Sequence, residues 1–311
     1  MELSLLLARQ ILSMLIMIFV GFATVRLGLL KKEDSRVLSA LVLYVLGPCL
    51  FFAAFQIDYS PEKLKGLLFG IIASAAVNLL TILISEVVGR ILHLSVVEKT
   101  SAIYTNCGNL IMPLTAAVLG NEYVFYGCAF TTVQTLLIWT HLISCIKGKR
   151  SFNFVKIITN PSIIATLAGL VIFILPFSFP AILNETIEKI SSTIGPVSMF
   201  SIGMIMSGFS LKKVFTDLRA FLVCLVRLVL VPAVIILIIA ATGITGRLSL
   251  AYPVLLTVVL AAAAPSAVSV AQLAELHGGD SERAGVINVM STLLCIITIP
   301  LMIGLYQILC G

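Results

Sequence analysis

Apolar residues fill most of this chain in long runs, and short polar segments separate one run from the next. A helix that crosses the hydrocarbon core of a bilayer needs about 20 mostly apolar residues. The chain divides into ten predicted spans of about that length: 3–25, 37–57, 66–88, 100–119, 123–146, 157–179, 190–209, 220–242, 248–276 and 284–309. The longest polar connection covers only residues 147–156, so there is no room for a soluble domain. The pattern predicts an all-α membrane protein with ten transmembrane helices.

The composition supports this prediction. Hydrophobic residues make up 60% of the 311 residues and charged residues only 11%, whereas a soluble domain carries about 25% charged residues. A water-soluble globule, a nucleic-acid-binding protein, a disordered chain and a secreted disulfide scaffold are therefore excluded. The seven cysteines lie in or beside apolar runs without metal-ligand spacing. They are expected to be packing residues, and the sequence predicts no metal and no cofactor.

The basic residues predict how the chain is oriented in a cell membrane. Of the 20 lysines and arginines, 14 lie in the connections after odd-numbered spans and 4 in those after even-numbered spans. Because cytoplasmic loops carry the excess of lysine and arginine, the odd-numbered connections are expected in the cytoplasm and both chain ends outside. The net charge of +6 then reflects topology, and no nucleic acid or other anionic partner is needed to explain it.

Two proline signatures recur at nearly constant spacing, 148 and 152 residues apart. The matched positions are Gly47-Pro48 with Gly195-Pro196, and Pro113 with Pro265. This recurrence divides the chain into a first five-helix repeat (1–146), a short cytoplasmic linker (147–156) and a second five-helix repeat (157–311). Because five is odd, the two repeats are inverted relative to each other. Inverted repeats with interrupted helices are typical of secondary transporters with a site near the midplane, and ordinary proline kinks are the alternative interpretation.

Polar side chains gather around the two mid-span prolines. In the fourth span, two amides three residues apart flank Gly108 and share one helix face. In the ninth span, two serines and a glutamine repeat at positions i, i+3 and i+6. The predicted lining consists of Asn106, Asn109, Ser266, Ser269 and Gln272. All five are expected between the midplane and the cytoplasm, where they either line a substrate site or form hydrogen bonds between helices.

The charges within the spans favour an anionic substrate. No carboxylate lies near the predicted midplane, which argues against a carboxylate-based site for Na⁺ or protons. Arg227 lies about two turns into the eighth span. Helix segments that restart after Pro113 and Pro265 would direct their partially positive ends towards the centre. Arg227 has two other interpretations: its side chain extends to the cytoplasmic surface, or it pairs with Glu86.

Several stretches resemble motifs of the auxin efflux carrier family. They are LVLYVLGPCLFF (41–52), TNCGNLIMPL (105–114), GPVSMFSIGMIMSG (195–208), AAAAPSAVSVAQLAELHGGD (261–280) and STLLCIITIPL (291–301). The motifs are distributed over most of the chain, and those between 261 and 301 are the most specific. The short connection 147–156 differs from the long cytoplasmic insert of plant members, so the chain resembles a prokaryotic member.

The resemblance implies ten helices in two inverted repeats. Helices one, two, six and seven would form a scaffold that usually dimerises, and helices three to five and eight to ten would form a moving transport unit. Helices four and nine would be interrupted and would cross at Pro113 and Pro265, close to the bound carboxylate. The two amides of helix four match those of the family. The serines of helix nine occupy the comparable face, although many relatives carry Asn where Ser269 stands.

The combined prediction is a secondary transporter that moves a small organic anion by alternating access. Candidate substrates are mono- and dicarboxylates such as auxin-like acids, malate and malonate. Substrate contacts are assigned to Asn106, Asn109, Pro113, Pro265, Ser266, Ser269 and Gln272, and supporting roles to Gly108, Pro48, Pro196 and Arg227. The expected partners are the lipid bilayer, the anion and a second copy of the chain in a homodimer. A sensor that binds an organic acid without transporting it is the alternative. An enzyme is not expected, because no nucleophile–base pair or metal cluster is predicted at membrane depth.

Overall fold

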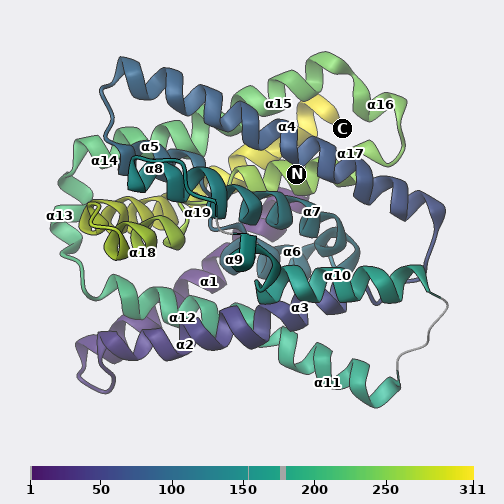
Figure 1. Cartoon of the computed structure of the whole chain (residues 1–311), viewed down its shortest axis with the longest axis horizontal. Coiled ribbons are helices and arrows are strands. Elements are labelled where there is room, and N and C mark those ends of the chain that lie inside the picture. The colour runs from purple at the N-terminus through teal and green to yellow at the C-terminus, as the bar shows by residue number, and fades with distance from the viewer. Residues whose placement is uncertain (1, 153, 176–179) are drawn as a thin grey trace.

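A computed structural model describes residues 2–152, 154–175 and 180–311, and the regular elements in this part of the chain are helices (Figure 1). The helices of the N-terminal half are α1 (Glu2–Arg26), α2 (Ser35–Leu41), α3 (Gly47–Ala54), α4 (Pro61–Ile91), α5 (Val96–Ile103), α6 (Met112–Val118), α7 (Asn121–Leu137) and α8 (Ile143–Lys147). Those of the C-terminal half are α9 (Phe154–Ile158), α10 (Pro161–Ile174), α11 (Ala181–Ser192), α12 (Ile194–Met206), α13 (Leu211–Thr216), α14 (Leu218–Leu225), α15 (Val231–Thr242), α16 (Ile244–Arg247), α17 (Ala251–Ala262), α18 (Val268–Leu276) and α19 (Ser281–Cys310). Within the same described residues, the π-helical segments are η2 (Val42–Leu46), η3 (Cys107–Ile111), η4 (Ile138–Leu142) and η5 (Val226–Leu230).

Each predicted span contains helix, and the end of the range 157–179 lies outside the described residues. Among the described residues, six helical stretches are long and apolar enough to cross a bilayer: Leu5–Arg26, Lys32–Ala54, Pro61–Ile91, Asn121–Lys147, Leu218–Thr242 and Ser281–Cys310. Shorter apolar helices are Cys107–Val118, Pro161–Ile174 and Ala251–Ala262. The chain is therefore an all-helical, multi-pass membrane protein, as predicted. Its division into ten spans and two inverted repeats stays a prediction.

Several prolines inside the helical stretches are accommodated without unwinding the helix. Pro48, Pro113 and Pro232 each stand two residues after a π-helical segment. A proline lacks an amide hydrogen, and its ring presses against the carbonyl group one turn earlier. The wider π turn relieves both effects by shifting the hydrogen-bond register. Pro196 lies in the first turn of α12, where amide groups have no partner inside the helix in any case.

The fourth and ninth predicted spans are both interrupted, but only one interruption contains its predicted proline. Between α5 and η3, the segment Tyr104–Asn106 is non-helical. Between α17 and α18, the segment 263–267 is non-helical and contains Pro265. The predicted crossing at Pro113 is wrong in position, because η3 accommodates this proline within the continuous helix that follows the break.

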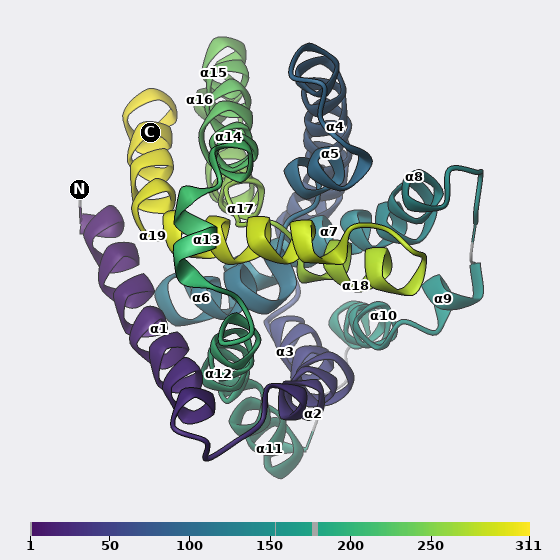
Figure 2. The same cartoon turned by 90° about the vertical axis from the view of Figure 1, so that its left-hand side faces the viewer.

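The first and twelfth helices pack closely, and glycines permit the approach. A Cβ atom added at Gly203 of α12 would clash with the backbone carbonyl of Ile18, and one added at Gly21 of α1 would clash with the backbone carbonyl of Phe200. α1 also packs against α19 (Figure 2). Both views place the two chain ends near each other, so the first and last helices of the chain are neighbours.

Candidate functional site

The two non-helical segments cross and form hydrogen bonds with each other. Thr105 and Ser266 form an isolated antiparallel β-bridge. The flanking backbone hydrogen bonds run from Asn106 N to Pro265 O at 2.8 Å and from Ala267 N to Tyr104 O at 2.9 Å. Unwound backbone inside a bilayer needs such internal partners, because lipid offers none. The bridge therefore satisfies backbone groups that the two interrupted helices leave unpaired.

Each crossing segment is also held by a later helix of the same half of the chain. Gln134 of α7 donates through Nε2 to the carbonyl oxygen of Thr105 at 2.8 Å, and its Oε1 accepts from the Thr105 amide at 3.1 Å and hydroxyl at 2.7 Å. Asn288 of α19 donates through Nδ2 to the carbonyl oxygen of Ser266. The Ser266 amide donates to the hydroxyl oxygen of Ser291 at 3.0 Å. Two carboxamides thus occupy corresponding positions at the two breaks.

Neither Gln134 nor Asn288 is among the residues predicted from the sequence. Both side chains are buried, and a buried amide requires hydrogen-bond partners. Their occurrence inside long apolar stretches is the signal in the sequence that marks them. It would not have shown which backbone groups they hold, because their partners lie in other helices.

Arg227 lies behind the crossing, fully buried in η5. Its guanidinium group donates to the carbonyl oxygens of Ala102 at 3.2 Å, Ile103 at 3.5 Å, Ala264 at 3.0 Å and Ala262. These oxygens lie at the C-terminal ends of α5 and α17, that of Ala264 just beyond the last residue of α17. Carbonyl groups there lack helical partners, and a cation is favourable. Arg227 is therefore a binding partner of the broken backbone itself.

The structure does not support the alternative interpretations of Arg227. A fully buried side chain does not extend to the surface. Glu86 pairs with Lys99 of α5, at 3.1 Å between Nζ and Oε2. The role expected for Arg227 near an anionic substrate also differs from its observed position, because it is absent from the lining of the cavity described next.

A cavity of about 960 Å³ lies beside the crossing. Its walls come from α2, η2, η3, α7, α10, α12, α18 and α19. The predicted residues that line it are Asn106, Gly108, Asn109, Ser269 and Gln272. The remaining predicted residues do not line it: Ser266, Pro265, Pro113, Pro48, Pro196 and Arg227. Ser266 and Pro265 instead form part of the crossing, so the structure brings the polar residues of both breaks together but divides them between cavity wall and backbone support.

Two helix N-termini meet at the cavity wall. The helix Cys107–Val118 follows Asn106, and α18 follows Ala267. The first amides of a helix have no acceptor within it, and this end carries partial positive charge. Gly108 and Asn109 of the first helix and Val268 and Ser269 of the second line the cavity. A Cβ atom added at Gly108 would meet nothing within 4 Å. An anion in the cavity would therefore face two positive helix ends.

The amide nitrogen of the Asn106 side chain adds a donor at this wall. It is buried and has no hydrogen-bond partner. A buried donor without a partner costs about 1–3 kcal/mol. A ligand with an acceptor oxygen would remove that penalty, so the geometry at Asn106 is suited to a carboxylate.

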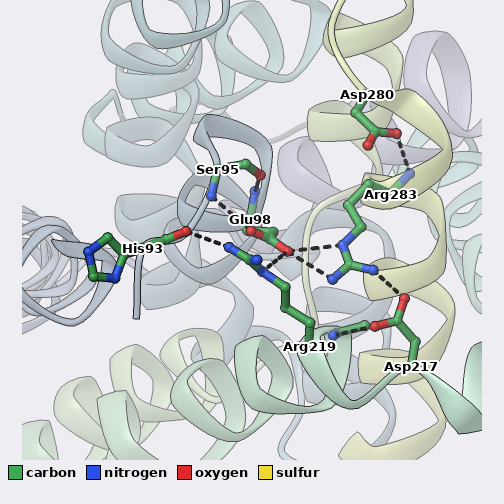
Figure 3. Close-up of polar contacts among 8 residues, drawn as sticks. His93, Ser95, Glu98, Asp217, Arg219, Asp280 and Arg283 are labelled. Atoms are coloured by element: carbon green, nitrogen blue, oxygen red, sulfur yellow. Dashed lines mark hydrogen bonds and ion pairs between the residues drawn. The ribbon is translucent and has the colours of Figure 1, made fainter. Parts of the chain in front are cut away.

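Outside the cavity, an ion-pair cluster joins the first turns of α5, α14 and α19 (Figure 3). Glu98 accepts from Arg219 at 3.0 Å and from Arg283 at 2.8 Å, and Arg283 also pairs with Asp217. Burial by itself raises the pKa of the Glu98 carboxyl. The hydrogen bond from the Ser95 amide and the two guanidinium groups outweigh burial and leave this pKa below its ordinary value. The cluster fixes the starts of three helices that lead to the crossing or support it.

Interrupted helices that cross beside a polar cavity, within an otherwise apolar helical protein, are typical of membrane transporters. A family model described as membrane transport protein matches residues 6–303. The chain therefore belongs to this family, the auxin efflux carrier family that its motifs resemble. The family consists of transporters and not of enzymes.

Two relatives align with nearly the whole chain. An uncharacterised transporter from Methanothermobacter thermautotrophicus is 26% identical over 306 residues, which cover 94% of this chain and 95% of the relative. A protein from Rhizobium meliloti, named as a candidate malonate transporter, is 24% identical over 304 residues, which cover 91% of this chain and 90% of the relative.

Proposed function

We propose that this membrane transporter is a secondary carrier of a small organic anion and works by alternating access. The observation that supports this proposal is the polarity of the crossing. Two helix N-termini lie at the cavity, and Asn106, whose side-chain amide nitrogen has no partner, belongs to its lining. Arg227 instead binds the C-terminal helix ends on the other side. A carboxylate beside Asn106 and Asn109 would accept hydrogen bonds from the helix N-termini and from the Asn106 amide, which lack partners in the described part of the protein.

The proposal includes two inverted five-helix repeats. Helices from both repeats would form the scaffold, and the remaining helices of both would form the transport unit. The scaffold would comprise α1–α3 and α9–α12, and the transport unit α4–α8 and α13–α19. The position of the cavity supports this division, because α2, α10 and α12 line one part of it and η3, α7, α18 and α19 line the other. The paired supports at the two breaks, Gln134 and Asn288, agree with a repeat.

The proposed orientation places the odd-numbered connections in the cytoplasm and both chain ends outside. The cavity extends to Lys32, Ser210 and Ser281, which lie in or beside connections with the predicted cytoplasmic charge bias. In this orientation the described conformation is inward-facing. A homodimer formed through the scaffold stays a prediction of the family resemblance.

The direct test is exchange of labelled malonate by proteoliposomes preloaded with unlabelled malonate. Malonate is the first candidate because a distant relative is named for it. We expect saturable exchange by the wild type and a decrease of about tenfold or more in Asn109→Ala, since a hydrogen bond to a charged group is lost. Asn184→Ala removes an amide of α11 outside the cavity lining and serves as the control. No exchange of malonate or other short carboxylates by the wild type, or full exchange by Asn109→Ala, would contradict the proposal.

A further inference from the structure

A buried polar side-chain atom without a hydrogen-bond partner is a candidate contact for a ligand. Among the side chains that the structure describes, several hydroxyl and amide groups are buried without a hydrogen bond. Of these, the two that belong to residues lining the cavity are Asn106 Nδ2 and Ser198 Oγ. Asn106 is already part of the proposed site. Ser198, in α12, is only 2% exposed and was not predicted from the sequence.

The absence of a partner at Ser198 is informative because a serine inside a helix usually has one. Such hydroxyls commonly donate to the carbonyl oxygen one turn earlier. Ser207, at the end of the same helix, does so to Met204 at 2.7 Å. Ser201, one turn beyond Ser198, pairs with Ser39 at 2.8 Å. Ser198 therefore differs from Ser201 and Ser207 in that its hydroxyl group has no hydrogen-bond partner among the described residues, and it is a residue of the cavity lining.

The packing of α12 places Ser198 opposite the amides of the crossing. Pro113 lies next to Gly195, at 3.7 Å from the position of a Cβ atom there. Leu110 and Met199 line one small void between the same elements. The earlier residue Leu110 is near the later residue Met199, and the later residue Pro113 is near the earlier residue Gly195. The two segments therefore run antiparallel. Ser198 is therefore at the height of Asn109, on the wall that belongs to the proposed scaffold.

Resting on the proposed function, we infer that Ser198 is a second anchor for the substrate and that the substrate is a short dicarboxylate. One carboxylate binds at Asn106 and the two helix N-termini. The other accepts a hydrogen bond from the Ser198 hydroxyl group. A monocarboxylate binds only at Asn106 and the two helix N-termini, and it leaves the buried Ser198 hydroxyl group without a hydrogen-bond partner. A site with a buried polar group selects against the analogue that cannot pair with it, so the second carboxylate determines specificity.

The test compares malonate with propionate, a monocarboxylate of similar size, in the proteoliposome assay. We expect the wild type to prefer malonate and Ser198→Ala to reduce malonate transport about tenfold, with little effect on propionate. Ser198→Thr keeps the hydroxyl group and is expected to restore much of the preference. Ser207→Ala removes a hydroxyl from the same helix outside the cavity lining and serves as the matched control.

The outcomes separate this inference from the function on which it rests. Transport of both acids by the wild type without a preference for malonate, or an equal loss of both in Ser198→Ala, would overturn the second anchor and leave the proposed carrier intact. Transport of neither acid would overturn the second anchor, and no exchange of any other short carboxylate would overturn the proposed carrier as well. A thermal shift of the purified wild type by malonate, absent for propionate and absent in Ser198→Ala, would support the anchor independently of flux.

Discussion

The crossing has two sides, and they differ in how their helix ends are satisfied. On one side, the C-terminal ends of α5 and α17 meet the guanidinium group of Arg227, which donates to four carbonyl oxygens. On the other side, two helix N-termini line the cavity, and the amide nitrogen of Asn106 is buried without a partner. We call these the closed side and the open side.

The difference separates what the fold needs from what a ligand would use. A broken helix in a bilayer exposes carbonyl groups at one end and amide groups at the other. On the closed side, the chain supplies its own partner for the carbonyl groups. On the open side, the amide groups and Asn106 belong to residues that line a space that a solute can enter. Substitutions on the closed side should therefore act on stability, and those on the open side on transport.

The largest effect is expected for Arg227→Met. The variant leaves four buried carbonyl oxygens without their donor, and each unsatisfied group costs about 1–3 kcal/mol. The total approaches the stability of a typical domain, about 5–15 kcal/mol, so we expect little folded protein. Size-exclusion chromatography in detergent and the thermal unfolding midpoint measure this.

Arg9→Met is the matched control, because Arg9 is exposed. Arg227→Lys keeps the charge but cannot present the planar set of donors that reaches both helix ends, so an intermediate loss is expected. A monodisperse Arg227→Met variant with the midpoint of the wild type would show that the closed side does not depend on this side chain.

A smaller loss is expected for Gln134→Ala than for Arg227→Met. Gln134 makes three hydrogen bonds to Thr105, two of them to its backbone. Removing the amide leaves a buried N–H and a buried carbonyl unpaired, which costs about 2–6 kcal/mol in total. Asn288→Ala loses one hydrogen bond to Ser266 and should be less destabilised. The two unfolding midpoints measure the difference, and a reversed order would mean that the second break is the weaker one.

The open side could be predicted from the sequence more completely than the closed side. Asn106, Gly108 and Asn109 stand out because polar or small residues in an apolar run are conspicuous, and they do line the cavity. Arg227 is equally conspicuous, but its role depends on Ala102, more than a hundred residues away along the chain. Periodicity and charge carry no information about such a contact.

The position of the first break shows the same limit. A proline predicts a local defect, and Pro113 has one, because η3 precedes it. Where the chain unwinds depends instead on the hydrogen bonds between Thr105 and distant partners, the bridge to Ser266 and the amide of Gln134. These are tertiary contacts, so the sequence predicts that the helix is interrupted but not where.

Two glycines distinguish the packed regions of the molecule from the open ones. Gly203→Ala places a methyl group against the backbone of Ile18, and overpacking of this kind costs about 1–3 kcal/mol. Gly108→Ala meets nothing within 4 Å, so its stability should match the wild type, while transport falls because the methyl group enters the cavity. Unfolding midpoints and exchange rates together test this. Equal stability losses in the two variants would contradict the assignment of Gly108 to open space.

The smallest effect concerns the ion-pair cluster, which lies on neither side of the crossing. The pKa of Glu98 is lower in the folded protein than its ordinary value of 4.5, so between the two values the unfolded chain binds more protons. Stability from this group is therefore complete above pH 4.5 and is lost as the pH falls through the folded pKa.

Glu98→Gln should lower the unfolding midpoint at pH 7 and flatten its decrease in acid. Glu185→Gln, whose carboxylate is 66% exposed beside Lys189, should behave like the wild type. If the midpoints of wild type and Glu98→Gln fell in parallel from pH 5 to pH 3, the acid sensitivity would belong to other groups, and the cluster would contribute to helix placement without contributing to pH dependence.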